Sequence, residues 1–173
     1  MSYNSGETKI RFIEIIREND GLIYKVSKMY SNSFEDEQDL FQDIVYQLWK
    51  SFSSFRNESK ITTWMYRIAL NTGIHYLDKG KKKAHKVSLD ETLLNRPEII
   101  DESKQDQYDM MFAQIKRLND IERGIIFLYL EGKAHDEIAM ITGFTITNIG
   151  TRIGRIKQKL ISQINLNKAG NGI

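Results

Sequence analysis

The side chains best suited to chemistry in this chain lie in its last third and could hold phosphate groups. Several cations follow at helical spacing after a glycine, and no Asp or Glu stands between Thr145 and the C-terminus. Guanidinium and ammonium groups without neighbouring carboxylates attract nucleic-acid phosphates. The cations that we expect on the free face of this segment are Arg152, Arg155, Lys157 and Lys159.

The pattern around these cations predicts a helix-turn-helix. Ile138, Ala139 and Ile141 have the spacing of one short helix, Gly143 suits the turn after it, and Thr145 can cap a second helix. A basic helix behind a glycine turn is typical of an element that meets DNA, although a solvated basic helix has the same composition. We expect the buried stripe of the second helix to be Ile146, Ile149, Ile153, Ile156 and Leu160.

Length and composition limit the architecture and the class of protein. A chain of 173 residues with 40% hydrophobic content can bury one moderate core or two small ones, and we predict two small domains. The absence of cysteine excludes disulfides and thiolate metal sites and is consistent with the cytoplasm. No apolar run is long enough to cross a bilayer, so we expect neither a signal peptide nor a membrane anchor.

The helical period dominates the N-terminal half, which predicts an all-α fold. Segments 8–18 and 21–31 have the pattern of a helical hairpin, and Ser33 can cap a longer helix after it. That helix has the apolar stripe Leu40, Phe41, Ile44, Val45, Leu48, Trp49 and Phe52. Its first turns are densely acidic, with Glu35, Asp36, Glu37, Asp39 and Asp43. Such a face repels DNA and favours a basic protein surface.

A polar loop at residues 53–60 leads into another helix, which we expect to reach a break at residues 78–80. Aromatic and basic residues are interleaved along it, and a lysine-rich run follows without one acid. The composition then turns acidic and polar, which indicates a domain boundary. We predict an N-terminal domain at residues 1–83, a flexible linker at 84–106 and a C-terminal helix-turn-helix domain at 107–173.

The order of these features resembles the extracytoplasmic-function (ECF) class of bacterial RNA polymerase sigma factors. The run Asp39-Leu40-Phe41-Gln42-Asp43, ending in Trp49, resembles the family segment that docks on the clamp helices of RNA polymerase. Residues 55–58 and 63–71 resemble its minus-ten recognition segment, and residues 118–160 resemble the domain that reads the minus-thirty-five duplex. The resemblance covers nearly the whole chain.

The resemblance implies partners and a set of contact residues. The partners are core RNA polymerase at its clamp region, promoter DNA and an anti-sigma factor, with no membrane insertion and no cofactor. The implied polymerase contacts are Asp39, Leu40, Gln42 and Asp43. The implied minus-ten contacts are Phe55, Arg56, Asn57, Lys60, Tyr66, Arg67 and Asn71. The implied minus-thirty-five contacts are Thr145, Thr147, Asn148, Thr151, Arg152, Arg155 and Lys159.

Three positions have alternative interpretations or depart from the family pattern. Trp64 could stack on single-stranded DNA, but a tryptophan at helical spacing among apolar residues is more often a core residue. Gly150 and Gly154 stand where the family usually presents larger polar side chains, which lowers helix propensity and removes possible base contacts.

Other classes of function have weaker support. His135-Asp136-Glu137 has the composition of a metal site, but adjacent helical residues point about 100° apart, and we expect His135 to be the exposed start of a helix. No catalytic or metal site is predicted. The main alternative is a stand-alone helix-turn-helix regulator, whose receiver domain would need alternating strands and helices. An adaptor or anti-sigma module is a further alternative, which two separate basic surfaces disfavour.

Overall fold

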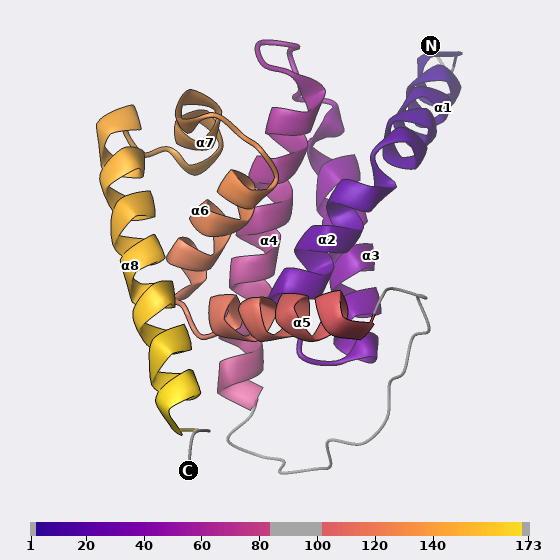
Figure 1. The fold of residues 1–173 in the computed structure, drawn as a ribbon. Coiled ribbons are helices and arrows are strands. Elements are labelled where there is room, and N and C mark those ends of the chain that lie inside the picture. Colours follow the sequence, from indigo (N-terminus) through magenta and orange to yellow (C-terminus); the bar gives the residue numbers. More distant parts are fainter. Residues whose placement is uncertain (1–2, 84–101, 171–173) are drawn as a thin grey trace. The chain divides into compact units, whose positions relative to one another are not determined.

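The computed structural model describes residues 3–83 and 102–170, and these residues form eight helices (Figure 1). No strand occurs in this part of the chain, which confirms the predicted all-α fold. The chain divides into two compact units, residues 1–94 and 95–173, and each is described here by itself. Most of the predicted flexible linker, residues 84–101, lies outside the described residues.

The first unit contains α1 (Tyr3–Glu18), α2 (Asp20–Tyr30), α3 (Phe34–Phe52) and α4 (Ile61–Lys83). Helices α2, α3 and α4 pack against one another in all three pairs, and α1 packs on α3. The largest fully buried side chains of this unit come from α2, α3 and α4 and include Tyr30, Leu40, Ile44, Leu48 and Met65. These three helices therefore form the core of the N-terminal unit.

The predicted hairpin of the first two helices is wrong. Helix α1 leads into α2 instead of folding back along it (Figure 1), and it contacts α3 through Phe12. The Phe12 ring lies 5.0 Å from the Trp49 ring and 5.3 Å from the Phe52 ring, both on α3. Ile10 and Ile13, two apolar residues at helical spacing in segment 8–18, are 60% and 38% exposed, so they do not pack as a hairpin would require.

The start of α3 agrees with the sequence pattern, whereas the end of α4 does not. The Ser33 side chain accepts a hydrogen bond from the Asp36 amide at 3.1 Å, which confirms Ser33 as the cap. Helix α4 continues through the expected break at residues 78–80 as far as Lys83. A helical glycine such as Gly80 costs only about 1 kcal/mol, which does not end a helix that continues on both sides.

The second unit contains α5 (Glu102–Lys116), α6 (Asp120–Leu130), α7 (His135–Thr142) and α8 (Ile146–Gly170). Helices α6, α7 and α8 pack against one another, and α5 packs on α6 and α8. Asn119 caps α6 by accepting the Glu122 amide at 2.8 Å. The buried Arg123 donates to the carbonyls of Lys116 and Leu118 and so ties the end of α5 to α6.

Helices α7 and α8 form the predicted helix-turn-helix. Gly143 ends α7 with φ of +81°, a conformation that favours glycine, and its amide donates to the Ala139 carbonyl at 2.8 Å. The Thr145 hydroxyl accepts the Asn148 amide at 3.2 Å, which confirms the cap of α8. Ile149, Ile153 and Ile156 are buried and Leu160 is half-buried, as expected. Ile146 is 56% exposed, so its place in the buried stripe was predicted wrongly.

None of the helices within residues 3–83 and 102–170 is both long enough and apolar enough to cross a membrane.

Helices α2 and α4 approach closely at Gly73, and we expect Gly73→Ala to destabilise the N-terminal unit. A Cβ atom at residue 73 would lie 2.8 Å from Cγ of Tyr30, a fully buried side chain. Overpacking of this kind costs about 1–3 kcal/mol, measured as a lower urea midpoint of the full chain. Gly80→Ala is the matched control on the same helix, because its Cβ would meet nothing within 4 Å. Equal stability of the two variants would contradict the close approach.

Candidate polymerase and nucleic-acid interfaces

The acidic face of α3 presents some of its polar side chains to solvent and engages others inside the unit. Asp39, Gln42 and Asp43 are exposed. Leu40 is fully buried, so the structure corrects its assignment as a polymerase contact: it supports α3 from the core side. Asp36 is half-buried and accepts a hydrogen bond from the Tyr76 hydroxyl of α4 at 3.0 Å.

The pKa of the Tyr76 hydroxyl reflects the negative charge on the acidic face of α3. Burial raises the pKa of the Tyr76 hydroxyl far above its ordinary value, and the hydrogen bond to Asp36 raises it further. The charges of Asp36, Asp39 and Asp43 act on the pKa in the same direction. All three carboxylates therefore lie close enough to α4 to oppose ionisation of the Tyr76 hydroxyl. Asp39 and Asp43, the two exposed ones, give the surface of α3 a concentrated negative potential.

Aromatic packing anchors the loop between α3 and α4 to the core of the N-terminal unit. The Phe55 ring lies 5.0 Å from the Trp64 ring, and Trp64 in turn lies 6.2 Å from Phe52 in the core. Trp64 is half-buried, which agrees with its interpretation as a packing residue. Phe55 is half-buried too, so its ring is only partly available to an extruded base.

Beyond these aromatic contacts, the loop exposes polar side chains. Arg56, Asn57 and Lys60 are exposed, and Asn57 has φ of +56°, in the left-handed region that Asn tolerates better than most residues. The backbone turns sharply at this point. The polar side chains of Arg56, Asn57 and Lys60 therefore project from a loop that Phe55 and Trp64 anchor.

Helix α4 separates the predicted minus-ten residues into exposed and buried ones. Arg67 and Asn71 are exposed and stand four residues apart, which places them on one face of the helix. Tyr66 is only 5% exposed, which corrects its prediction as a surface contact. Its place beside buried Met65 and Ala69 shows that the aromatic ring serves the core.

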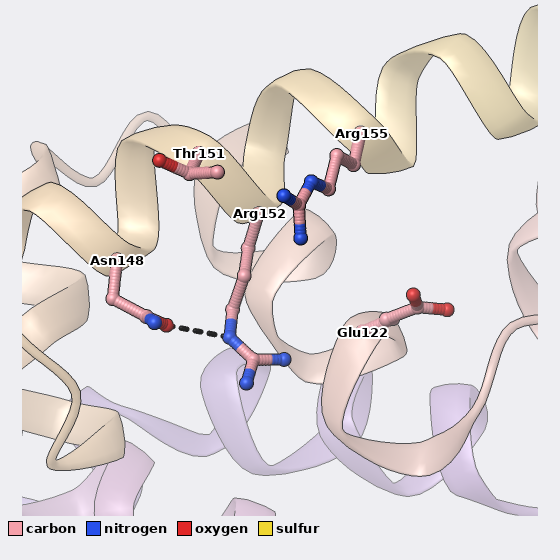
Figure 2. A pocket seen from close by; sticks show the side chains of 5 residues that line it. All are labelled: Glu122, Asn148, Thr151, Arg152 and Arg155. Atoms are coloured by element: carbon pink, nitrogen blue, oxygen red, sulfur yellow. Dashed lines mark hydrogen bonds between the residues drawn. The ribbon is translucent and has the colours of Figure 1, made fainter.

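The outer face of α8 carries the predicted minus-thirty-five residues. Thr145, Thr147, Asn148, Thr151 and Arg155 are exposed, and Arg152 is half-buried. A pocket of about 160 Å³ lies between α8 and the start of α6 (Figure 2). Its lining consists of Glu122, Asn148, Thr151, Arg152 and Arg155.

Arg152 is held in one conformation by two neighbours on its own segment. Its Nε donates to Asn148 Oδ1 at 2.6 Å (Figure 2), and its guanidinium lies 4.4 Å from the centre of the Phe144 ring. The hydrogen bond and the ring contact therefore orient a guanidinium group that lines the pocket. Phe144 was not predicted as a site residue, although an aromatic residue directly before the cap of a basic helix is a usable signal.

Two of the four predicted free cations are engaged within the unit. Lys159 Nζ contacts both carboxylate oxygens of Glu122, at 2.8 and 3.0 Å. Lys157 Nζ contacts the Tyr129 hydroxyl at 2.7 Å and lies 4.1 Å from the centre of its ring. Both lysines lie on the exposed face, as expected, but each ammonium group is engaged by a neighbour, so neither is a free cation. Glu122 was not predicted as part of this surface.

Gly150 and Gly154 of α8 lie on a flank without close packing. A Cβ at Gly150 would meet His135 at 3.8 Å, an ordinary contact, and one at Gly154 would meet nothing within 4 Å. His135 is the exposed first residue of α7, as predicted. Within the described residues, no group of three or more His, Asp or Glu side chains is placed to hold a metal ion.

Comparisons with known proteins agree with these features. The family model for sigma-70 region 2 matches residues 15–83. RNA polymerase sigma factor SigV of Bacillus subtilis is 28% identical over 151 residues, which cover 86% of this chain and 87% of SigV. The ECF RNA polymerase sigma-E factor of Haemophilus influenzae is 26% identical over 144 residues, which cover 76% of each chain. Residues 15–83 therefore form a sigma-70 region 2, and the chain as a whole is similar to ECF-class RNA polymerase sigma factors over most of its length.

Solved structures show the same fold. The sigma factor RpoE in a co-crystal with the anti-sigma factor NepR from Bartonella quintana matches with a TM-score of 0.71 and 19% identity, over 90% of this chain and 97% of RpoE. CnrH in complex with the cytosolic domain of CnrY matches with a TM-score of 0.66 and 16% identity, over 91% and 90%. The function of this sigma factor is promoter-specific transcription initiation through RNA polymerase, and the stand-alone regulator is not favoured.

Burial of the Tyr76 hydroxyl, together with its hydrogen bond to Asp36, raises the pKa of Tyr76 and makes the stability of the first unit sensitive to alkali. Tyr76 ionises near pH 10 in the unfolded chain but only at higher pH in the folded unit. Its contribution is therefore complete below pH 10 and is lost as the pH rises above that value. We expect Tyr76→Phe to cost roughly 0.5–1 kcal/mol at pH 7 and to lose less stability between pH 7 and 11 than the wild type.

The measurement is the urea midpoint at both pH values, with Tyr46→Phe as the control. Tyr46 lies on α3 in the same unit and is 60% exposed, so its removal should change neither quantity. If Tyr76→Phe lost as much stability as the wild type between pH 7 and 11, ionisation of Tyr76 would not contribute to the pH dependence of stability.

Proposed function

We propose that the two units divide promoter recognition between them. In this proposal residues 1–83 dock on the clamp region of core RNA polymerase and hold the opened minus-ten strand, and residues 107–173 grip the minus-thirty-five duplex. The observation that carries the proposal is the distribution of charge: α3 of the first unit exposes carboxylates, whereas α8 of the second exposes hydroxyls, an amide and guanidinium groups. The first surface suits a basic protein and the second suits DNA.

The polymerase contact is assigned to Asp39, Gln42 and Asp43. Their exposure on one acidic helix supports this assignment, because carboxylates a turn apart form a compact negative patch. The raised pKa of Tyr76 supports it further, since it reflects the field of Asp39 and Asp43 together with Asp36. Charge complementarity would speed the encounter with a basic clamp surface and fix its register.

The minus-ten contact is assigned to the loop and to the adjoining exposed face of α4. Promoter opening requires a protein that holds bases outside the stack, and an anchored loop with exposed polar side chains suits that task. Arg56, Asn57 and Lys60 would serve on the loop, with the edge of the Phe55 ring beside them. Arg67 and Asn71 would contact the displaced strand, where the Asn71 amide offers both a donor and an acceptor.

The minus-thirty-five contact is assigned to the outer face of α8. Thr147, Asn148 and Thr151 are exposed in its first two turns, where helix-turn-helix proteins read base edges. Arg152 and Arg155 would bind phosphate or a base edge from the pocket between α8 and α6. Gly150 and Gly154 contribute no side chain, which would restrict readout to a narrow set of bases.

Linkage of the two units through polymerase would turn two weak DNA contacts into one strong one by effective concentration. We propose a non-catalytic protein that works in the cytoplasm, where an anti-sigma factor masks one of its surfaces. The solved complex of RpoE with the anti-sigma factor NepR supports a partner of this kind. The predicted linker, residues 84–106, ends in the first five residues of α5 and would let the units reach separate promoter elements.

We expect Asp43→Lys to abolish co-elution of the chain with core RNA polymerase in size-exclusion chromatography at moderate salt. The substitution reverses the charge of an exposed α3 residue, so circular dichroism should remain unchanged. Glu14→Lys is the matched control, because it reverses an exposed carboxylate on α1 outside the acidic face. Retained co-elution of Asp43→Lys would refute the docking assignment, and failure of the wild type to bind polymerase would refute the proposal as a whole.

We expect Asn71→Ala to reduce promoter opening by about tenfold or more while polymerase affinity stays within twofold. The exposed amide would be lost from the strand contact, at the roughly 1–2 kcal/mol of a hydrogen bond to nucleic acid. Permanganate reactivity of the opened strand measures the effect. Asn32→Ala removes an exposed amide from the loop before α3 and should open promoters normally. Equal opening by both variants would exclude Asn71 from the minus-ten contact.

A further inference from the structure

The pocket beside α8 contains one carboxylate among groups that otherwise suit an anion. Glu122 comes from the first turn of α6, and the remaining lining residues, Asn148, Thr151, Arg152 and Arg155, come from α8. A carboxylate at this place could pair with either arginine and neutralise it. Neither arginine makes such a pair within the described residues: Arg152 contacts Asn148 and Phe144, and Arg155 has no hydrogen bond or ion pair.

The Glu122 carboxylate is instead bound by Lys159. The lysine ammonium contacts both carboxylate oxygens, at 2.8 and 3.0 Å, and the Glu122 side chain is only 17% exposed. In Figure 2 the Glu122 carboxylate points away from the Arg152 guanidinium, and both guanidinium groups reach from α8 toward the space beside α6. The side chain of a glutamate is long enough to turn, so its direction depends on the cation that holds it.

We infer that Lys159 is a positioning residue, which prevents the Glu122 carboxylate from forming an ion pair with Arg152 or Arg155, and that it does not contact DNA itself. The inference rests on the proposed binding of the minus-thirty-five duplex by α8. Without Lys159, the carboxylate would lose both of its charge-assisted hydrogen bonds and would turn to the nearest guanidinium. A planar guanidinium binds a carboxylate at two points and thereby loses the geometry that it needs for a DNA phosphate.

This role explains the arrangement better than a direct phosphate contact by Lys159 does. A lysine that binds DNA would have to break two short hydrogen bonds and leave a largely buried carboxylate beside the phosphates. The pair as it stands instead adds no net charge and preserves both arginines. The two roles differ in one measurable respect, because only the positioning role disappears when Glu122 itself is removed.

The test measures binding of the full chain to a fluorescein-labelled duplex of mixed sequence by anisotropy, as a function of salt. Each phosphate contact contributes about 0.9 to the slope of log K against log salt. If Lys159→Met lets Glu122 occupy one arginine, the slope falls in magnitude by about 0.9 and affinity at 0.1 M salt falls roughly eightfold. The double variant Glu122→Gln with Lys159→Met should return both quantities to about the wild-type values.

A matched control separates this rescue from a general gain of positive charge. Asp136→Asn combined with Lys159→Met also removes one exposed carboxylate of the same unit, at the start of α7, and should stay as weak as Lys159→Met alone. If Lys159→Met bound the duplex equally weakly with and without Glu122→Gln, the inference would be overturned and Lys159 would be a phosphate contact. Unchanged binding by Lys159→Met would overturn it as well.

A second measurement tests the inference without DNA. The Nε–H signals of Arg152 and Arg155 in nitrogen-15 NMR spectra should shift in Lys159→Met and return in the double variant, because only the first allows a pair with Glu122. Absence of that shift would overturn the positioning role. If the wild-type chain bound the duplex without salt dependence while Lys159→Met still showed the NMR shift, the proposed DNA contact would be refuted and the pairing of Lys159 with Glu122 would stand.

Discussion

The recognition surface of the second unit depends on burial of the isoleucine stripe of α8. Ile149, Ile153 and Ile156 are each at most 3% exposed, in a unit where α8 packs on α5, α6 and α7. Because side chains recur every 3.6 residues, burial of this stripe fixes the rotation of α8 about its axis. Every other side chain on the helix then has a set direction, and those proposed to meet DNA point outward as a consequence of apolar packing.

Internal pairing decides how much of the charge in this chain remains available to partners. Asp36 is bonded to Tyr76, Lys159 to Glu122, and Lys157 to Tyr129, so charged groups that look alike in the sequence differ in what they can bind. On α3 the pairing leaves Asp39 and Asp43 exposed beside a fixed carboxylate. On α8 it leaves the guanidinium groups as the cations that face the pocket. Both proposed interfaces are therefore smaller than the charge pattern predicts.

Aromatic packing has the corresponding role in the proposed minus-ten element. Phe52, Trp64 and Phe55 form a chain of ring contacts that runs from the core to the loop. A loop anchored in this way keeps few of its conformations, so its exposed polar groups lose less entropy when they bind a single strand. The close approach of α2 and α4 at Gly73 holds the helix that carries Arg67 and Asn71 against the same core.

The sequence by itself determined the helical fold, the two-part organisation that we propose, the family, the caps at Ser33 and Thr145 and the turn at Gly143. These features follow from local periodicity and from short-range hydrogen bonds, which a linear pattern contains. Only the tertiary structure decided that Leu40 and Tyr66 are buried, that Ile10 and Ile146 are exposed, and that Lys159 pairs with Glu122 across 37 positions of the chain. Exposure and long-range pairing depend on which helices pack together, and periodicity marks an apolar face without stating what covers it.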